Sequence, residues 1–165
     1  MKIICFSKIG DTIQMELKGD SSLQVNRKPF FIPDWCTDVR MTPCVVLRVS
    51  RLGKNIGSRF ANRYYDSMAL GVNIIAADYV AQGDWVRGFA FDYSLPVGEF
   101  APIEQPIEGL VLDIDTAVEI ASKVMTIRQG DLIVVDRDIA ARALLPEEVI
   151  REEKDGKEVL YCKIK

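Results

Sequence analysis

The hydrophobic pattern of this chain is dominated by short apolar runs separated by glycine, aspartate and proline. Residues 2–6, 44–49 and 132–135 are rich in β-branched side chains and partly alternate with polar residues, which predicts strands. Residues 71–80 have the same character. Residues 149–164 predict a hairpin, because an Asp-Gly pair in the middle favours a tight type I′ turn.

Two segments have helical spacing instead. Ser58 is a suitable N-cap for a helix over residues 59–68, whose apolar side chains recur every three or four positions. Residues 116–125 predict a second helix, in which Thr116 and Glu119 form a capping box. Strands outnumber helices, and there is no repeat or linker. The pattern therefore predicts one α+β, mainly β, domain over residues 1–165.

Composition narrows the classes of partner and compartment. The 165 residues are 48% hydrophobic and 27% charged, with a net charge of −3 and a pI near 5.1, which disfavours nucleic acid and anionic membranes as partners. No apolar run approaches the roughly 18 residues of a membrane span, and the first residues do not resemble a signal peptide. We expect a cytoplasmic protein.

Histidine is absent, which removes imidazole bases, Ser-His and Cys-His nucleophiles and His-ligated metals. The four cysteines form no C-x-x-C pair, so neither a zinc knuckle nor a thioredoxin-like site is indicated. Cys5 and Cys162 lie within apolar or alternating runs and are expected to be small buried hydrophobes. Any chemistry must use carboxylates, lysine, arginine, tyrosine, thiols or backbone groups.

The residues alone offer few sites. Asp113 with Asp115, and Asp136 with Asp138, are two apart, so an extended backbone would place each pair on one side, where carboxylates can hold a divalent cation. Solvated strand and helix ends explain the same spacing. A cluster with Arg48, Arg51 and Lys54 could hold an anion beside a glycine turn, or could simply keep the surface soluble.

A family resemblance joins several of these segments. Residues 46–56 have the sequence VLRVSRLGKNI and are followed by RFA at 59–61, which resembles the strand, turn and helix motif of the fumarylacetoacetate hydrolase superfamily. Weaker matches, in the same order along the chain, are Lys18 and the segments 28–33, 71–78, 91–98 and 130–133.

The resemblance implies a fold and a chemistry. The fold is a mixed β-roll, of the type of the fumarylacetoacetate hydrolase C-terminal domain, with two or three short helices and paired into a homodimer. Members cleave C–C bonds of diketo acids, decarboxylate oxaloacetate-like acids or isomerise related dienoates. They use Mg²⁺ or Mn²⁺ held by a Glu-x-Glu pair and an Asp, with a lid that carries a His and a Glu.

This sequence departs from the family at those positions. The resemblance places Thr42 and Cys44 at the Glu-x-Glu pair and Asn73 at the aspartate, so three negative charges are missing. The lid is also missing, because the chain passes from Ile9 to Met15 in a few residues. Neutral oxygens and a thiol do not replace carboxylates around a hard cation, so Thr42, Cys44 and Asn73 mark a degenerate metal site.

Three functions remain open. The leading hypothesis is a non-catalytic member without catalytic residues, metal or other cofactor, which acts as a binding or regulatory subunit in a homodimer or with a related active subunit. The alternative is an enzyme of keto acids that uses Mg²⁺ or Mn²⁺ at a relocated site made by Asp92, Asp136 and Asp138. The third is a binder of a small organic anion. It would use three basic residues, Lys18, Arg51 and Lys54.

Overall fold

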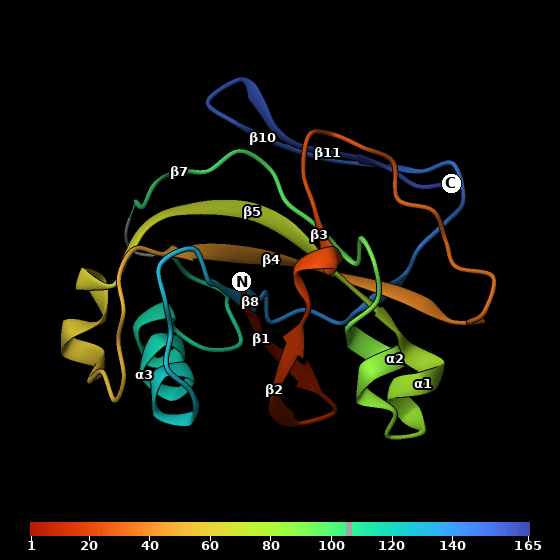
Figure 1. Cartoon of the computed structure of the whole chain (residues 1–165). Coiled ribbons are helices and arrows are strands. Elements are labelled where there is room, and N and C mark those ends of the chain that lie inside the picture. The colour runs from red at the N-terminus through yellow and green to blue at the C-terminus, as the bar shows by residue number, and fades with distance from the viewer. Residues whose placement is uncertain (105–106) are drawn as a thin grey trace.

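A mixed seven-stranded sheet organises the chain, which the computed structural model describes at residues 1–104 and 107–165. The strand order is β2-β1-β8-β4-β5-β7, with β9 paired to β4 (Figure 1). These strands are β1 (Ile3–Ile9), β2 (Thr12–Lys18), β4 (Val39–Val49), β5 (Tyr65–Ala76), β7 (Ala101–Pro102), β8 (Leu132–Asp136) and β9 (Arg142–Ala143). Two smaller sheets pair β3 (Leu23–Gln24) with β6 (Leu95–Pro96) and β10 (Val149–Lys154) with β11 (Lys157–Lys163).

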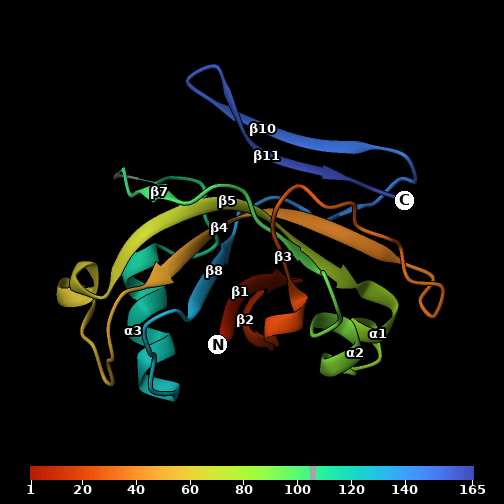
Figure 2. The same cartoon turned by 45° about the horizontal axis from the view of Figure 1, so that its top comes forward.

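Layers cover both faces of the long β4–β5 pair. The helix α3 (Ile114–Val124) and the short helices α1 (Ala77–Ala81) and α2 (Trp85–Phe89) lie on one side, with the β1–β2 hairpin between them, and β10–β11 lies on the other (Figures 1 and 2). The 3₁₀ helices are η1 (Asp20–Ser22) and η2 (Ser58–Arg63). Because both faces are covered, β8 is buried along its whole length.

The strand register decides which polar residues meet. β4 and β5 pair antiparallel with Thr42 opposite Asn73 and Cys44 opposite Gly71. On its other edge β4 pairs with β8, which places Cys44 opposite Asp136. β1 pairs parallel with β8 and antiparallel with β2. Residues from β1, β2, β5 and β8 therefore converge beside one end of the sheet.

Most of the predicted elements are confirmed. Strands occur at 3–9, 39–49 and 132–136, a helix at 114–124, and a hairpin at 149–163. Asp155 and Gly156 have φ values of 52° and 76°, as the two central positions of a type I′ turn require. The fold is α+β and mainly β, as predicted.

The helix predicted over residues 59–68 is wrong. Only Ser58–Arg63 is helical, as a 3₁₀ turn, and β5 begins at Tyr65. The apolar spacing was real, but pairing with β4 provides the later residues with backbone partners that a helix cannot match. At its other end the strand stops at Ala76 instead of Val80, because α1 begins at Ala77.

The cap of α3 also differs from the prediction. The N-cap is Asp113, whose carboxylate accepts hydrogen bonds from the Thr116 amide at 3.0 Å and from its hydroxyl at 2.5 Å. Glu119 instead accepts from the Ser58 amide at 2.8 Å and from the Lys123 ammonium at 2.5 Å. The carboxylate of Glu119 therefore ties η2 to α3 and forms no capping box.

Two other features match the composition. All four cysteines are free and buried, as expected for Cys5 and Cys162. Among the described residues, no helix is both long enough and apolar enough to span a bilayer.

Candidate functional site

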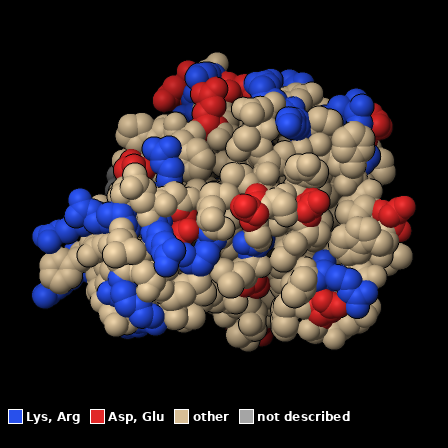
Figure 3. Space-filling model, in the orientation of Figure 1, with Lys and Arg blue, Asp and Glu red and all other residues tan. Residues whose placement is uncertain are grey.

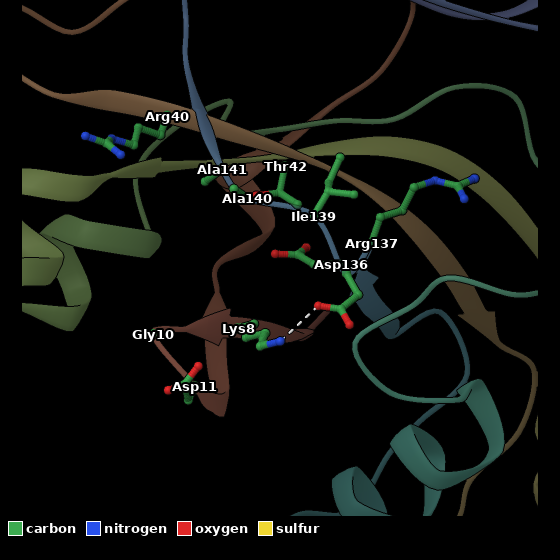
Figure 4. A pocket seen from close by; sticks show the side chains of 11 residues that line it. Lys8, Gly10, Asp11, Arg40, Thr42, Asp136, Arg137, Ile139, Ala140 and Ala141 are labelled. Carbon is green, nitrogen blue, oxygen red and sulfur yellow. Dashed lines mark hydrogen bonds and ion pairs between the residues drawn. The ribbon is translucent and has the colours of Figure 1, made fainter.

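A cavity of about 430 Å³ opens where the β1–β2 turn faces β4 and the segment after β8 (Figure 4). Thr42 comes from β4 and Asp136 from the end of β8. The lining residues are Lys8, Gly10, Asp11, Arg40, Thr42, Asp136, Arg137, Asp138, Ile139, Ala140 and Ala141. In Figure 4 the Asp136 carboxylate lies centrally, while the Arg40 and Arg137 side chains extend away to either side.

Asp136 is the carboxylate at the inner end of the cavity, and its partners are neutral. The residue is 4% exposed. The Asn73 amide Nδ2 donates to both of its oxygens, at 3.1 Å each. Burial raises the pKa of Asp136 to about 7, although these hydrogen bonds and the nearby Lys18 ammonium act in the opposite direction.

A second buried carboxylate continues this network. The same Asn73 amide donates to Ser7 Oγ at 3.1 Å, and the Ser7 hydroxyl donates to Glu16 Oε2 at 3.3 Å. Burial first, and then the charge of Asp136, raise the pKa of Glu16 to about 8. Glu16 Oε1 has no hydrogen-bond partner among the described residues, so an anion at this position would be poorly stabilised.

Lys18 is the buried cation of this region. Its ammonium donates to Ile74 O at 2.9 Å, Phe89 O at 2.7 Å and Ser94 Oγ at 2.8 Å. Those three acceptors use all three of its protons. Burial lowers the pKa of Lys18 to about 8, opposed by the nearby thiols of Cys5 and Cys44 and by the two buried carboxyls. We call Ser7, Glu16, Lys18, Asn73 and Asp136 the buried polar cluster.

The positions predicted to be a degenerate metal site separate into two environments. Thr42 lines the cavity, and Asn73 lies opposite it on β5 and contacts Asp136. Cys44 is 1% exposed and lies in an apolar cluster with residues such as Ile3 and Val46. Burial raises the pKa of its thiol well above the ordinary value, so Cys44 is neither a ligand nor a nucleophile in this state.

The other predicted site residues are not brought together. Asp138 forms an ion pair with Lys8, with 3.1 Å between Oδ1 and Nζ. Asp92 is exposed in a different hollow, beside Phe31 and Trp35. Asp136, Asp138 and Asp92 therefore form no carboxylate cage.

The three basic residues of the organic-anion hypothesis are also separated. Lys18 is buried beneath α2, whereas Arg51 and Lys54 are exposed in the loop between β4 and η2. Lys54 Nζ donates to Lys123 O at 2.9 Å, and the Arg51 guanidinium lies over the Tyr64 ring.

The donor set of the cavity does not fit Mg²⁺ or Mn²⁺. Among the described residues no group of three or more His, Cys, Asp or Glu side chains could hold a metal ion. The Asn73 amide donates hydrogen bonds to both oxygens of Asp136, the carboxylate beside Thr42 that a cation would need. The raised pKa of Asp136 also favours its protonated form. Hard divalent cations depend on several anionic oxygens held together, and the other carboxylates that line the cavity, Asp11 and Asp138, do not form such a group with Asp136.

The sequence analysis missed two members of the cluster, Ser7 and Glu16. A signal was present, since Glu16 and Lys18 are two apart in a strand and therefore share a face. The mixed composition of residues 9–25 gave no clear strand, so Lys18 was singled out only as a family match and a possible anion ligand, and Glu16 was not singled out at all. They are buried because β1, β5 and β8 converge around them.

The sheet order, the crossing layers and the cavity beside β4 and β8 define the class: the chain has the fold of the fumarylacetoacetate hydrolase superfamily, as the sequence motif predicted. No protein-family profile matches the sequence, and no curated protein matches it either.

Solved structures that share the fold include hydrolases and isomerases. A fumarylpyruvate hydrolase from Pseudomonas aeruginosa, in complex with Mn²⁺ and pyruvate, has a TM-score of 0.86 at 15% identity, covering 99% of this chain and 89% of its own. A 5-carboxymethyl-2-hydroxymuconate delta-isomerase from Mycobacterium smegmatis has a TM-score of 0.85 at 17% identity, and the match covers 99% of this chain and 78% of the isomerase chain. A fumarylacetoacetate hydrolase family protein from Yersinia pestis has a TM-score of 0.82 at 17% identity, and the match covers 99% of this chain and 92% of the other chain.

Proposed function

We propose that this chain is a non-catalytic protein with a fumarylacetoacetate hydrolase fold, in which a hydrogen-bonded side-chain network replaces the metal site. It acts as a binding or regulatory subunit. The observation that carries this proposal is the Asn73 amide, which donates to both oxygens of Asp136 beside Thr42. An amide donor in that place satisfies the carboxyl group and repels a cation.

The charge balance of the buried polar cluster supports the same conclusion. Lys18 supplies a positive charge without any metal, and both carboxyls have raised pKa values. A dication placed beside Asp136 would have to break the two Asn73 hydrogen bonds and would meet no other anionic ligand on Thr42 or Asn73. The related hydrolase was solved with Mn²⁺ and pyruvate, so the fold accommodates a metal where its residues permit one.

Metal binding and turnover test this proposal. We expect calorimetry to detect no binding of Mg²⁺ or Mn²⁺ at about 1 mM, because the affinity that remains with one protonatable carboxyl is millimolar or weaker. We expect no metal-dependent loss of acylpyruvates or oxaloacetate. Asp136→Asn is the matched variant and should behave like the native chain. Sub-millimolar Mn²⁺ binding that Asp136→Asn abolishes would contradict the proposal and favour a relocated metal site.

An exposed apolar groove along an edge strand supports the role of a subunit. A groove of about 480 Å³ runs along β2, an edge strand of the main sheet, between α2 and the end of α3. Four apolar side chains at its rim are 46–72% exposed: Leu17, Trp85, Val86 and Val124. Glu16 is the one ionisable residue among those that line the groove. We propose that a second copy covers it, because an uncovered edge strand can pair antiparallel with its own two-fold mate.

The oligomeric mass tests the second copy. We expect light scattering after gel filtration to give a dimer, twice the chain mass of 18.5 kDa. The pair of changes Val86→Lys and Val124→Lys should yield monomers by placing like charges in an apolar contact. Phe31→Lys, at another residue exposed by 64%, is the control and should remain dimeric. A native monomer at about 100 µM, or equal effects of all three changes, would rule out this interface.

A further inference from the structure

Positive charge is segregated at one end of this acidic protein. From Arg48 to Tyr65, both included, the chain has five Lys or Arg residues and no Asp or Glu, although its net charge is −3. The structure places most of this segment in the loop between β4 and β5, which includes η2 and packs on α3. Figure 3 shows Lys and Arg side chains gathered over this end of the molecule, on the left of the view.

Contacts between the loop and α3 extend the charged area. The Gly53 amide donates to Ile127 O, and the Asn55 amide donates to Ser122 O, both at 3.0 Å. These bonds bring the C-terminal end of α3 and the following loop beside the arginines. We call the resulting set the basic surface. It comprises six exposed residues, Arg51, Lys54, Arg59, Arg63, Lys123 and Arg128.

Most of the charge on the basic surface is not neutralised within the chain. The arginines at 51, 59, 63 and 128 form no ion pair with any described carboxylate, whereas twelve ion pairs occur elsewhere or at Lys123. Lys54 donates to a carbonyl, and Lys123 pairs with Glu119. Like charges held this close repel each other, which an external anion would relieve.

Two of the guanidinium groups are held in place by one ring. Arg59 lies 4.4 Å and Arg63 5.1 Å from the centroid of the Phe60 ring. Their guanidinium groups are therefore oriented by cation–π contacts before any partner arrives, which lowers the entropy lost on binding. Planar guanidinium groups bind oxyanions through paired hydrogen bonds.

The shape of the surface and its aromatic rings decide which kind of anion fits. The basic surface contributes no residue to either the Asp136 cavity or the β2 groove, and its cations are spread over an exposed loop and a helix end. A small molecule would need a concave site. Single-stranded nucleic acid needs free aromatic faces for its bases, but Phe60 and Tyr64 are engaged by arginines.

We propose that the basic surface docks a carboxylate-rich segment of a partner protein, with Arg59 and Arg63 as its central anchors. This inference rests on the charge distribution and on the two arginines held by the Phe60 ring, and it does not depend on the state of the metal site. It supplies the chemistry of a partner, namely clustered Asp and Glu side chains, for a chain whose own net charge is negative.

A labelled peptide of alternating glutamate and serine, about ten residues long, tests the proposal by fluorescence anisotropy. We expect binding at about 50 mM NaCl that weakens roughly tenfold by 300 mM, because exposed charges are screened over a few ångströms at high salt. Arg59→Gln with Arg63→Gln should weaken it at least tenfold. Arg27→Gln with Arg151→Gln, which removes the same charge elsewhere, should leave binding within about twofold.

Three results would contradict the proposal, and one control separates an effect on binding from an effect on folding. Absence of peptide binding at low salt, or equal losses in the two double variants, would overturn the docking surface. An RNA oligonucleotide of equal charge that binds more tightly than the peptide would overturn the assignment to carboxylates. Unchanged melting temperatures of both double variants would show that the arginine changes act on binding and not on folding.

Discussion

Replacing Lys18 by methionine is expected to lower the free energy of unfolding by about 3–5 kcal/mol, because each buried polar group left without a partner costs about 1–3 kcal/mol. Methionine keeps the length of the side chain but removes the ammonium. Three buried acceptors, Ile74 O, Phe89 O and Ser94 Oγ, would lose their donor. Urea denaturation followed by tryptophan fluorescence measures the change, which corresponds to roughly 10 °C in Tm.

A matched lysine separates this effect from loss of charge in general. Lys157 pairs with Glu99 on the surface, where both side chains are more than 60% exposed. Lys157→Met should change stability by less than about 0.5 kcal/mol, since exposed ion pairs contribute little. If Lys18→Met proved equally mild, Lys18 would not be a stabilising element of the cluster.

Stability is expected to fall as the pH rises from about 4.5 to about 8 and to recover above that. Glu16 and Asp136 have ordinary pKa values of 4.5 and 3.8, and burial raises them in the folded chain to about 8 and about 7. Within this window the folded chain keeps protons that the unfolded chain has released, so the free energy of unfolding decreases. The expected fall is on the order of 3 kcal/mol, from about 1.4 kcal/mol for each pKa unit and a large discount for coupling.

Lys18 reverses the slope at higher pH. Its ordinary pKa of 10.5 is lowered to about 8 in the folded chain, so between these values the unfolded chain binds more protons and stability rises with pH. The minimum should therefore lie near pH 8. Below about 4.5 the trend is again upward with pH, since surface contacts hold the Glu119 pKa at about 2.

Melting temperatures measured from pH 4 to pH 10 test this profile. The pair Glu16→Gln and Asp136→Asn should flatten the fall below pH 8, because amides do not titrate. Lys18→Met should flatten the rise above it. A native profile that rises steadily from pH 5 to pH 8 would show that the two carboxyls are ionised in the folded chain.

The motif at 46–56 carried more information than the local periodicity beside it. Its residues resemble a motif of the fumarylacetoacetate hydrolase superfamily, and that resemblance implied the fold. In the structure a Cβ at Gly53 would overlap Ile56 and Tyr64, which explains the glycine of the motif. The periodicity of residues 59–68, by contrast, predicted a helix that the protein does not form. Tyr64 packs against the hydrophobic core, whereas Phe60 is 37% exposed, and the chain from Tyr65 onward pairs with β4.

The candidate site was foreseen only in part. The resemblance placed Thr42, Cys44 and Asn73 at the positions of the family's metal ligands, and the strand register puts Thr42 opposite Asn73. It could not show that Asn73 reaches Asp136, which lies 63 positions away in the sequence. Nor could it show that Cys44 faces an apolar cluster instead of the cavity.

The sequence by itself determined the core strands β1, β4 and β8, the helix α3, the Asp155-Gly156 hairpin and the absence of histidine, because each depends on residues close together in the chain or on composition. Only the tertiary structure decided that Glu16, Lys18 and Asp136 share one buried region. Their burial depends on which strands become neighbours, and so do the pKa values that follow from it. Strand order is set by long-range packing over the whole sheet, which no local pattern encodes.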